Sequence, residues 1–128
     1  MLLNAGIITT KLSESKTFYT QTLGFKVKFE ADWFVLLHTA THADHEMAFM
    51  LPQLASQQPV FHPEFNGKGV YITLEVDNVM HEYNRIKSTG ISIEVELRDE
   101  PWGDRHFAVV DPNGIPVDIV ERFTNSQT

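Results

Sequence analysis

The pattern of hydrophobic and polar positions divides the chain into two halves with the same order of predicted elements. In each half an apolar segment precedes a segment with helical spacing, and three further apolar segments follow. Where apolar and charged residues alternate strictly, as in residues 25–30, the pattern indicates a half-buried strand. The predicted strands are residues 2–9, 25–30, 33–38 and 46–51 in the first half, and 70–76, 93–98, 105–110 and 115–121 in the second.

Each half contains one predicted helix, between its first and second strands. The first helix begins near Ser13 or Ser15, either of which is a suitable N-cap, and Gly24 ends it. The second follows Asp77, its expected N-cap, and stops before Gly90. The order βαβββ therefore occurs twice, which predicts an α+β fold.

The two halves are separated by residues 52–68, which contain three prolines and no regular hydrophobic period. We therefore predict a single domain over residues 1–128, made of modules 1–51 and 69–123 joined by this linker. Two half-sheets joined edge to edge, with the helices outside, would form a U-shaped mixed sheet with a concave face. The polar tail after Phe123 is expected to fray.

The most distinctive local pattern is the sequence Asp-Pro-Asn-Gly at residues 111–114, between two alternating apolar runs. Pro112 presets φ for the second position of a turn, and the Asn-Gly pair tolerates left-handed conformations. The pattern predicts a β-hairpin. Asp118 is the one charged side chain in the run that follows the turn, and Trp102 lies just upstream of the hairpin.

Composition and charge narrow the possible partners. The net charge is −7, and the ten Lys and Arg residues are scattered, which argues against nucleic-acid binding. A cationic or neutral small molecule suits this charge better. No apolar run approaches the roughly 20 residues of a membrane span, and no signal peptide is evident. The absence of cysteine excludes disulfides and thiolate ligands, and we expect a cytoplasmic protein.

Three segments resemble a known superfamily: SKTFYTQTLGFKV at 15–27, YITLEVDNV at 71–79 and PWGDRHFAVVDPNGIPVDIVE at 101–121. They are similar to the vicinal oxygen chelate superfamily, which contains glyoxalase I, extradiol dioxygenases, fosfomycin-resistance enzymes and bleomycin-resistance binding proteins. The resemblance spans nearly the whole chain. It implies paired βαβββ modules with a site in the U-shaped sheet, and a homodimer in which modules are packed or exchanged between chains.

The resemblance also implies where a metal would be bound. Metal-dependent members carry one ligand on each of four strands, and the matching positions here are Asn4, Met50, Tyr71 and Asp118. Only Asp118 is a plausible ligand, because hard divalent cations prefer carboxylate oxygen or imidazole. We therefore expect no metal and no cofactor, and the substitutions argue against an enzyme without excluding one.

The bleomycin-resistance subgroup is the closest in appearance, and it places aromatic residues where Trp102, Trp33 and Phe34 lie in this chain. The period of two along a strand adds Thr73 to the face that carries Tyr71. We predict a metal-independent binding protein for a partly aromatic compound, cationic or neutral, with a role in resistance or sequestration. The predicted ligand-binding residues are Asn4, Trp33, Phe34, Met50, Tyr71, Thr73, Trp102 and Asp118.

Three alternatives remain open. Asp118 could be a structural carboxylate that accepts a hydrogen bond from Tyr71 or Asn4. The protein could be a metal-dependent lyase or dioxygenase with an atypical ligand set that includes Asp118 and His106. It could also be a structural or regulatory module whose cleft is filled by its own side chains, in which case no cavity would lie beneath Trp102 and Tyr71.

The histidines give no clear metal site. His42 and His45 have suitable spacing but lie in a predicted loop, and two ligands without a third indicate an incidental surface site. His106 is of more interest because it starts a hairpin strand near Trp102. A general base would need an orienting partner, which the sequence does not reveal.

Overall fold

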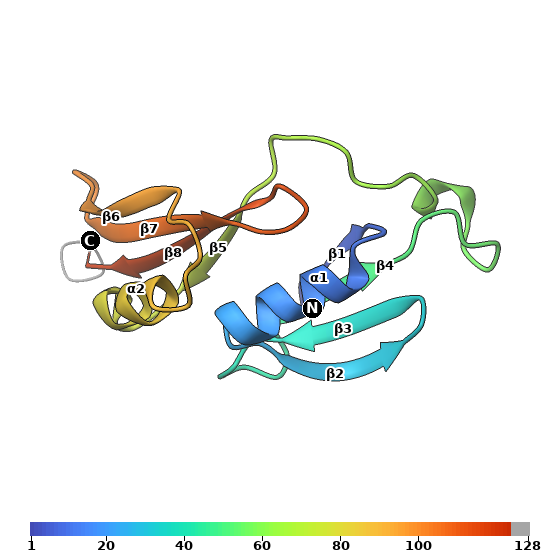
Figure 1. Cartoon of the computed structure of the whole chain (residues 1–128), viewed down its shortest axis with the longest axis horizontal. Helices are drawn as coiled ribbons and strands as arrows, with labels where there is room; N and C mark the ends of the chain where they lie inside the picture. Colours follow the sequence, from blue (N-terminus) through green and yellow to red (C-terminus); the bar gives the residue numbers. More distant parts are fainter. Residues whose placement is uncertain (124–128) are drawn as a thin grey trace. The chain divides into compact units, whose positions relative to one another are not determined.

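The computed structural model describes residues 1–123, which form two compact units that divide between residues 67 and 68 (Figure 1). The first unit contains β1 (Ala5–Ile8), α1 (Leu12–Thr17), the π-helix η1 (Phe18–Thr22), β2 (Lys26–Ala31), β3 (Phe34–His38), β4 (Glu46–Met50) and the short 3₁₀ helix η2 (Pro59–Phe61). The second contains β5 (Ile72–Glu75), α2 (Val79–Lys87), β6 (Val95–Asp99), β7 (Asp104–Val110) and β8 (Pro116–Arg122). The predicted order βαβββ is confirmed in both halves. The predicted fraying of the tail lies outside the described residues.

The two sheets have the same topology. The strand order is β1-β4-β3-β2 in the first sheet and β5-β8-β7-β6 in the second. In each sheet the first strand pairs in parallel with the last, and the other neighbours are antiparallel. The predicted α+β fold class is thus confirmed, module by module. That the modules form one domain, and that the protein is a homodimer, stay predictions.

Each helix packs on one face of its own sheet, α1 against β3 and β4, and α2 against β7 and β8 (Figure 1). In the first module the fully buried Tyr19 ring contacts Phe25 and Phe49, with ring centroids 5.3 and 5.2 Å apart. In the second, Phe107 is fully buried and meets the Tyr83 ring edge-on at 5.2 Å. The core of each module therefore lies between its helix and its sheet.

The first helix begins earlier than the sequence pattern predicts. Its N-cap is Lys11, so the prediction of Ser13 or Ser15 at this position was wrong. Ser15 is buried inside the helix, where it cannot take the extended conformation of an N-cap. The last turns widen into η1, in which the Leu23 N–H donates to the carbonyl of Phe18, five residues back. Hydrophobic spacing does not distinguish this widening from an α-helix.

The second helix is capped one residue later than predicted. Asn78, rather than Asp77, has the extended backbone of an N-cap, and its side chain accepts a hydrogen bond of 3.0 Å from the His81 N–H. Asp and Asn are both favoured N-caps, so the sequence alone does not decide which of these two neighbouring residues begins the helix. Val79 and Ile86 of this helix are buried.

The segment 52–68 is more ordered than its composition suggests, and residues up to 67 cluster with the first unit. The Phe65 N–H donates to the Ile8 carbonyl at 2.8 Å, and the backbone and hydroxyl of Thr10 both donate to Glu64 Oε2. β1 is an edge strand, so its outer carbonyls are open to such backbone bonds. Backbone pairing of this kind leaves no hydrophobic period in the sequence.

Residues 25–30 depart from the predicted half-buried strand. The register of β2 shifts between Val27 and Phe29, and these two side chains are 41% and 52% exposed. The shift is a β-bulge at Lys28, and β2 lies at the edge of its sheet. The bulge brings the Phe29 ring to 6.2 Å from Phe34 instead of into the core.

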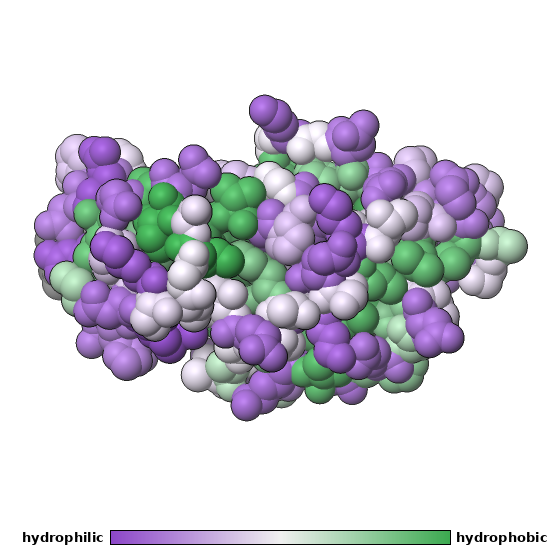
Figure 2. Space-filling model, viewed as in Figure 1, coloured by the Kyte–Doolittle hydropathy of each residue, from purple (hydrophilic) through white to green (hydrophobic). Residues whose placement is uncertain are grey.

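The surface mixes both kinds of residue, and Figure 2 shows hydrophobic patches between hydrophilic side chains on the face it draws. In the part of the chain that the structure describes, no helix is long and apolar enough to cross a membrane. The exposed aromatic side chains include Phe29, Trp33, Phe61, Tyr71 and Trp102. Two of these, Tyr71 and Trp102, belong to the pocket described next.

Candidate functional site

The predicted hairpin at residues 105–121 is confirmed, and its turn is built by Asp111. The Asp111 side chain is 4% exposed, and its Oδ1 accepts hydrogen bonds from the N–H groups of Asn113 at 2.8 Å and Ile115 at 2.9 Å. The Gly114 N–H donates to the Asp111 carbonyl, and Gly114 has φ +84°, which a side chain would disfavour. The turn therefore fixes the register between β7, which precedes it, and β8, which follows it.

That register decides which side chains share a face. Ala108 pairs with Asp118, His106 with Val120, and Asp104 with Arg122. Val117 and Ile119, which alternate with these positions on β8, are buried on the side of α2. Alternation then places the paired polar residues on the opposite face of the sheet.

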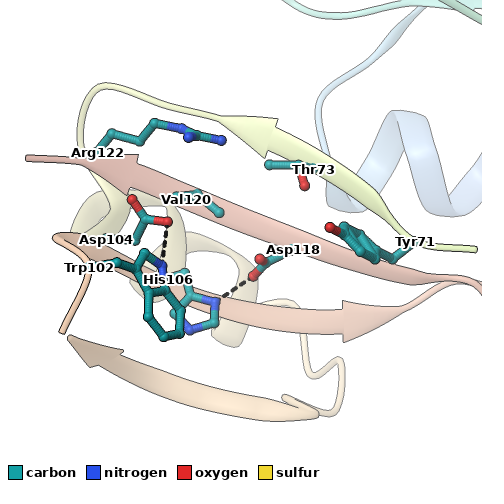
Figure 3. Close-up of a pocket in the computed structure, with 8 residues that line it drawn as sticks. All are labelled: Tyr71, Thr73, Trp102, Asp104, His106, Asp118, Val120 and Arg122. Atoms are coloured by element: carbon teal, nitrogen blue, oxygen red, sulfur yellow. Dashed lines mark hydrogen bonds and ion pairs between the residues drawn. The ribbon is translucent and has the colours of Figure 1, made fainter. Parts of the chain in front are cut away.

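A pocket of about 200 Å³ opens on this second face (Figure 3). It is formed by side chains of β5, β7 and β8, the residue before β5, and the turn before β7. A cavity of about 150 Å³ is large enough for benzene, whereas drug-sized ligands use more than about 300 Å³. The volume therefore suits a compound with one substituted ring. The lining residues are Tyr71, Thr73, Trp102, Asp104, His106, Asp118, Val120 and Arg122.

Trp102 is held in place although its side chain is 62% exposed. Its indole N–H donates to Asp104 Oδ2 at 2.9 Å, as Figure 3 shows. The next residue, Gly103, has φ +102°, and its N–H donates to the Glu100 carbonyl. An exposed aromatic ring that is oriented in advance loses little conformational entropy when a ligand stacks on it.

His106 lies between two carboxylates. Its Nδ1 is 2.6 Å from Asp118 Oδ1, and its Nε2 is 2.9 Å from Glu100 Oε2. Arg98 Nε approaches the same Glu100 oxygen at 2.8 Å. Ionised carboxylates only accept hydrogen bonds, so a ring that faces two of them donates from both nitrogens as an imidazolium.

The charge state of His106 follows from a balance of opposed effects. Burial lowers the pKa of His106, but its hydrogen bonds to Asp118 and Glu100, together with the charges of these carboxylates, raise it more, and the pKa lies above its ordinary value of 6.5. The imidazolium is the form that both carboxylates stabilise. His106 thus has the orienting partners that the sequence did not reveal, but neither nitrogen is free to act as a general base.

The raised pKa predicts how stability depends on pH. Since the folded protein binds this proton more tightly than the unfolded chain, the stabilisation is fully present below the ordinary histidine pKa. It is lost as the pH rises through the raised pKa of His106. We expect the free energy of unfolding, measured by urea denaturation, to fall over this interval, and the fall to be absent in His106→Gln. The control is His81→Gln, at an exposed position on α2, which should retain the wild-type dependence; an equal dependence in both variants would contradict the assignment.

The structure brings together half of the predicted ligand-binding residues. Tyr71, Thr73, Trp102 and Asp118 line the pocket of the second module. The other four belong to the first module, where Asn4 precedes β1 and is exposed. There the rings of Trp33 and Phe34 lie 5.2 Å apart, and Phe34 pairs with Met50 across the sheet. The roles of all eight in binding a ligand stay predictions.

Five residues of the site were not in the predicted set: Glu100, Asp104, His106, Val120 and Arg122. All but Glu100 follow from the hairpin register, since counting by twos from the Asp-Pro-Asn-Gly turn puts them on the face of Asp118. Glu100 lies outside the strands, in the turn before β7, and no periodic signal indicates it.

Two observations bear on the open alternatives, while the role of Asp118 stays a prediction. The side-chain partner of Asp118 is His106, not Tyr71 or Asn4. A pocket is present beside Trp102 and Tyr71, so the cleft of this module is not filled by its own side chains.

The residues at the metal-ligand positions of the resembled family do not fit a divalent cation. Met50 offers a thioether, Tyr71 a phenol and Asn4 a weak amide, and the Oδ1 of Asp118 is hydrogen-bonded to His106. Within residues 1–123 no group of three or more His, Cys, Asp or Glu side chains could hold a metal ion.

The histidine pair in the loop before β4 is arranged for stacking. The rings of His42 and His45 lie nearly parallel, 8° apart in orientation, with centroids separated by 4.7 Å. His42 Nδ1 is within 2.8 Å of the Thr41 hydroxyl. This contact engages one of the ring nitrogens that a metal would need.

The sequence matches a family model described as the Glyoxalase/Bleomycin resistance protein/Dioxygenase superfamily, over residues 2–119. Among curated proteins, the uncharacterised protein Mb0911c of Mycobacterium bovis is 31% identical over 64 residues, which cover 50% of this chain and 42% of the relative. The match thus spans less than half the length of this relative.

Two solved structures share the fold but are named for different functions. The antibiotic binding protein TnmS3 from Streptomyces sp. CB03234 has a TM-score of 0.73 at 18% identity, with 95% of this chain and 95% of that chain covered. The lactoylglutathione lyase from Agrobacterium tumefaciens has a TM-score of 0.72 at 18% identity, with 94% and 92% covered. At such identities the likeness concerns the fold alone, so function has to be argued from the site.

Proposed function

Because the chain belongs to the glyoxalase/bleomycin resistance protein/dioxygenase superfamily, we propose that it is a metal-independent small-molecule binding protein whose site includes the pocket of the second module. The ligand is a small, partly aromatic compound. The role is sequestration or resistance, for which equimolar binding is sufficient and no catalytic group is needed. The fold is compatible with a role of this kind, since the antibiotic binding protein TnmS3 shares it.

The observation that carries the proposal is an exposed, oriented aromatic ring beside convergent polar groups. Trp102 is fixed by Asp104, and the hydroxyl groups of Tyr71 and Thr73 and the carboxylate of Asp118 lie around the same pocket. The lining is more polar than apolar, so the polar groups would fix the orientation of a ligand that stacks on the exposed ring. Such a site provides stacking for a ring and hydrogen-bond acceptors for its substituents.

The alternative, a metal-dependent lyase or dioxygenase that uses Asp118 and His106, requires free ligand atoms. Both nitrogens of His106 face carboxylate oxygens, and one oxygen of Asp118 is shared with His106. Coordination through His106 would have to replace one of these hydrogen bonds and remove the ring proton that makes it.

Elemental analysis of protein purified without added metal separates the two functions. We expect less than stoichiometric zinc, nickel, iron or manganese, and we expect a chelator to leave ligand binding unchanged. Stoichiometric metal in the wild type that is absent from Asp118→Ala would overturn the proposal. The control is Asp77→Ala, at an exposed position remote from the pocket lining, which should match the wild type in metal content.

A further inference from the structure

The chain contains two Asn-Gly pairs, Asn66-Gly67 in the linker and Asn113-Gly114 in the hairpin turn. An asparagine that precedes glycine loses its side-chain amide readily, because the glycine nitrogen can reach the amide carbon and no Cβ obstructs the approach. By sequence alone the two asparagines are equally susceptible. The structure gives the two pairs different surroundings.

The pair in the hairpin turn is held by hydrogen bonds. The Gly114 N–H donates to the Asp111 carbonyl at 3.0 Å, and the Asn113 N–H donates to Asp111 Oδ1 at 2.8 Å. Asp111 is buried and also accepts a hydrogen bond from the Ile115 N–H, so one side chain braces the whole turn. The glycine nitrogen must lose its hydrogen-bond partner before it can attack, and this requirement slows the reaction.

The pair in the linker has none of these restraints. The backbone bond before it runs from the Phe65 N–H to the Ile8 carbonyl, and residues 66–69, which lie in the loop between η2 and β5, are exposed (Figure 1). Within residues 1–123 the Gly67 N–H has no hydrogen-bond partner, and a methyl group at this position would meet no other atom within 4 Å. The Gly67 nitrogen is therefore free to approach the neighbouring amide, and water has access to the product.

We propose that Asn66 is a deamidation site of the folded protein, and that the hairpin turn protects Asn113 from the same reaction. The Gly67 nitrogen forms a bond to Asn66 Cγ and gives up its proton, while the bond from Cγ to the amide nitrogen breaks and ammonia leaves. Water then opens the cyclic succinimide. Opening at the main-chain carbonyl gives isoaspartate, and opening at Cγ gives aspartate, so water is the one co-reactant. Each product carries one more negative charge than asparagine.

The site lies where the two compact units divide, between residues 67 and 68. Isoaspartate routes the main chain through Cβ and Cγ, which adds one methylene group to the link between the modules. Asn66 and Gly67 belong to no helix or strand, so we expect each module to keep its stability. The inference concerns a different part of the chain from the pocket and does not depend on the proposed ligand.

The test is peptide mapping by mass spectrometry of the full folded chain, incubated at mildly alkaline pH, where the attacking nitrogen loses its proton more easily. We expect Asn66 to be converted to aspartate and isoaspartate at least about 10-fold faster than Asn113, because reaction at Asn113 requires the turn to lose hydrogen bonds. In concentrated guanidinium chloride the two pairs should react at comparable rates, since the turn is then absent.

Gly67→Ala is the matched control. The backbone of Gly67 lies outside the left-handed region and the space around it is open, so alanine fits without strain, but its Cβ hinders attack on Asn66. Enzymatic methylation of isoaspartyl carboxylates gives a second readout: labelling should increase with incubation time in the wild type and stay near background in Gly67→Ala. The inference is wrong if Asn113 reacts as fast as Asn66 in the folded protein, or if Asn66 reacts no faster in the wild type than in Gly67→Ala. Neither result bears on ligand binding, which is measured separately.

Discussion

Replacing Asp111 by alanine is expected to lower the free energy of unfolding of the second module by about 3 kcal/mol, since hydrogen bonds to a charged acceptor contribute roughly 1.5 kcal/mol or more each. Asp111 Oδ1 accepts two backbone hydrogen bonds in the turn, from Asn113 and Ile115. The side chain is 4% exposed, so water cannot easily replace the lost acceptor. The N–H groups left without it would weaken the turn that sets the register of β7 and β8.

The measurement is urea denaturation followed by the fluorescence of Trp102, in a Trp33→Phe background so that the signal comes from the second module. Asp111→Asn is the matched control, because it retains an oxygen acceptor and loses only the charge. It should lose clearly less stability than Asp111→Ala. A change within about 0.5 kcal/mol for Asp111→Ala, the range of ordinary surface substitutions, would show that the turn does not depend on this side chain.

Replacing Trp102 by alanine is expected to weaken ligand binding at least 10-fold. A stacked aromatic pair contributes about 1 kcal/mol beyond the area it buries, and removal of the indole also removes that buried area. Every 1.4 kcal/mol changes the dissociation constant tenfold. Since the indole is 62% exposed, its loss should leave the fold intact.

The dissociation constant of para-trimethylammoniobenzoate, measured by ligand-observed NMR, checks this second expectation. Trp102→Phe keeps a ring but not the indole N–H that donates to Asp104. We expect it to retain part of the affinity. An affinity of Trp102→Ala equal to that of the wild type would place the ligand elsewhere.

The fold was predictable because its signals are local. The Asp-Pro-Asn-Gly turn specifies a hairpin within four residues, and the order βαβββ follows from the change between alternating and helical spacing. The errors have local causes too. A β-bulge at Lys28 reversed the expected burial of Phe29, and the choice between neighbouring cap residues moved the start of α2 from Asp77 to Asn78.

The site was only partly predictable, because it depends on the register between strands. Tyr71, Thr73 and Asp118 could be placed on one face by alternation within their own strands. The contact between His106 and Asp118 is diagonal across β7 and β8, and it requires the turn length to be known first.

Glu100 was beyond prediction, since a turn places it against His106 and no repeating pattern points to it. The cost of missing it was chemical as well as geometric. Asp118 alone gives the His106 ring one acceptor, whereas Glu100 and Asp118 together give each ring nitrogen an acceptor.

The central claim, that the pocket beside Trp102 is a ligand site, is tested most directly by fluorescence of the two single-tryptophan proteins. Trp33→Phe reports on Trp102, and Trp102→Phe reports on Trp33, because the chain contains only these two tryptophans. Titration with phenyltrimethylammonium, para-trimethylammoniobenzoate or para-tert-butylbenzoate should quench Trp33→Phe saturably, with the same dissociation constant in the presence of a chelator. Asp118→Ala in that background should alter the constant. Saturable quenching in Trp102→Phe alone, with none in Trp33→Phe, would contradict the account.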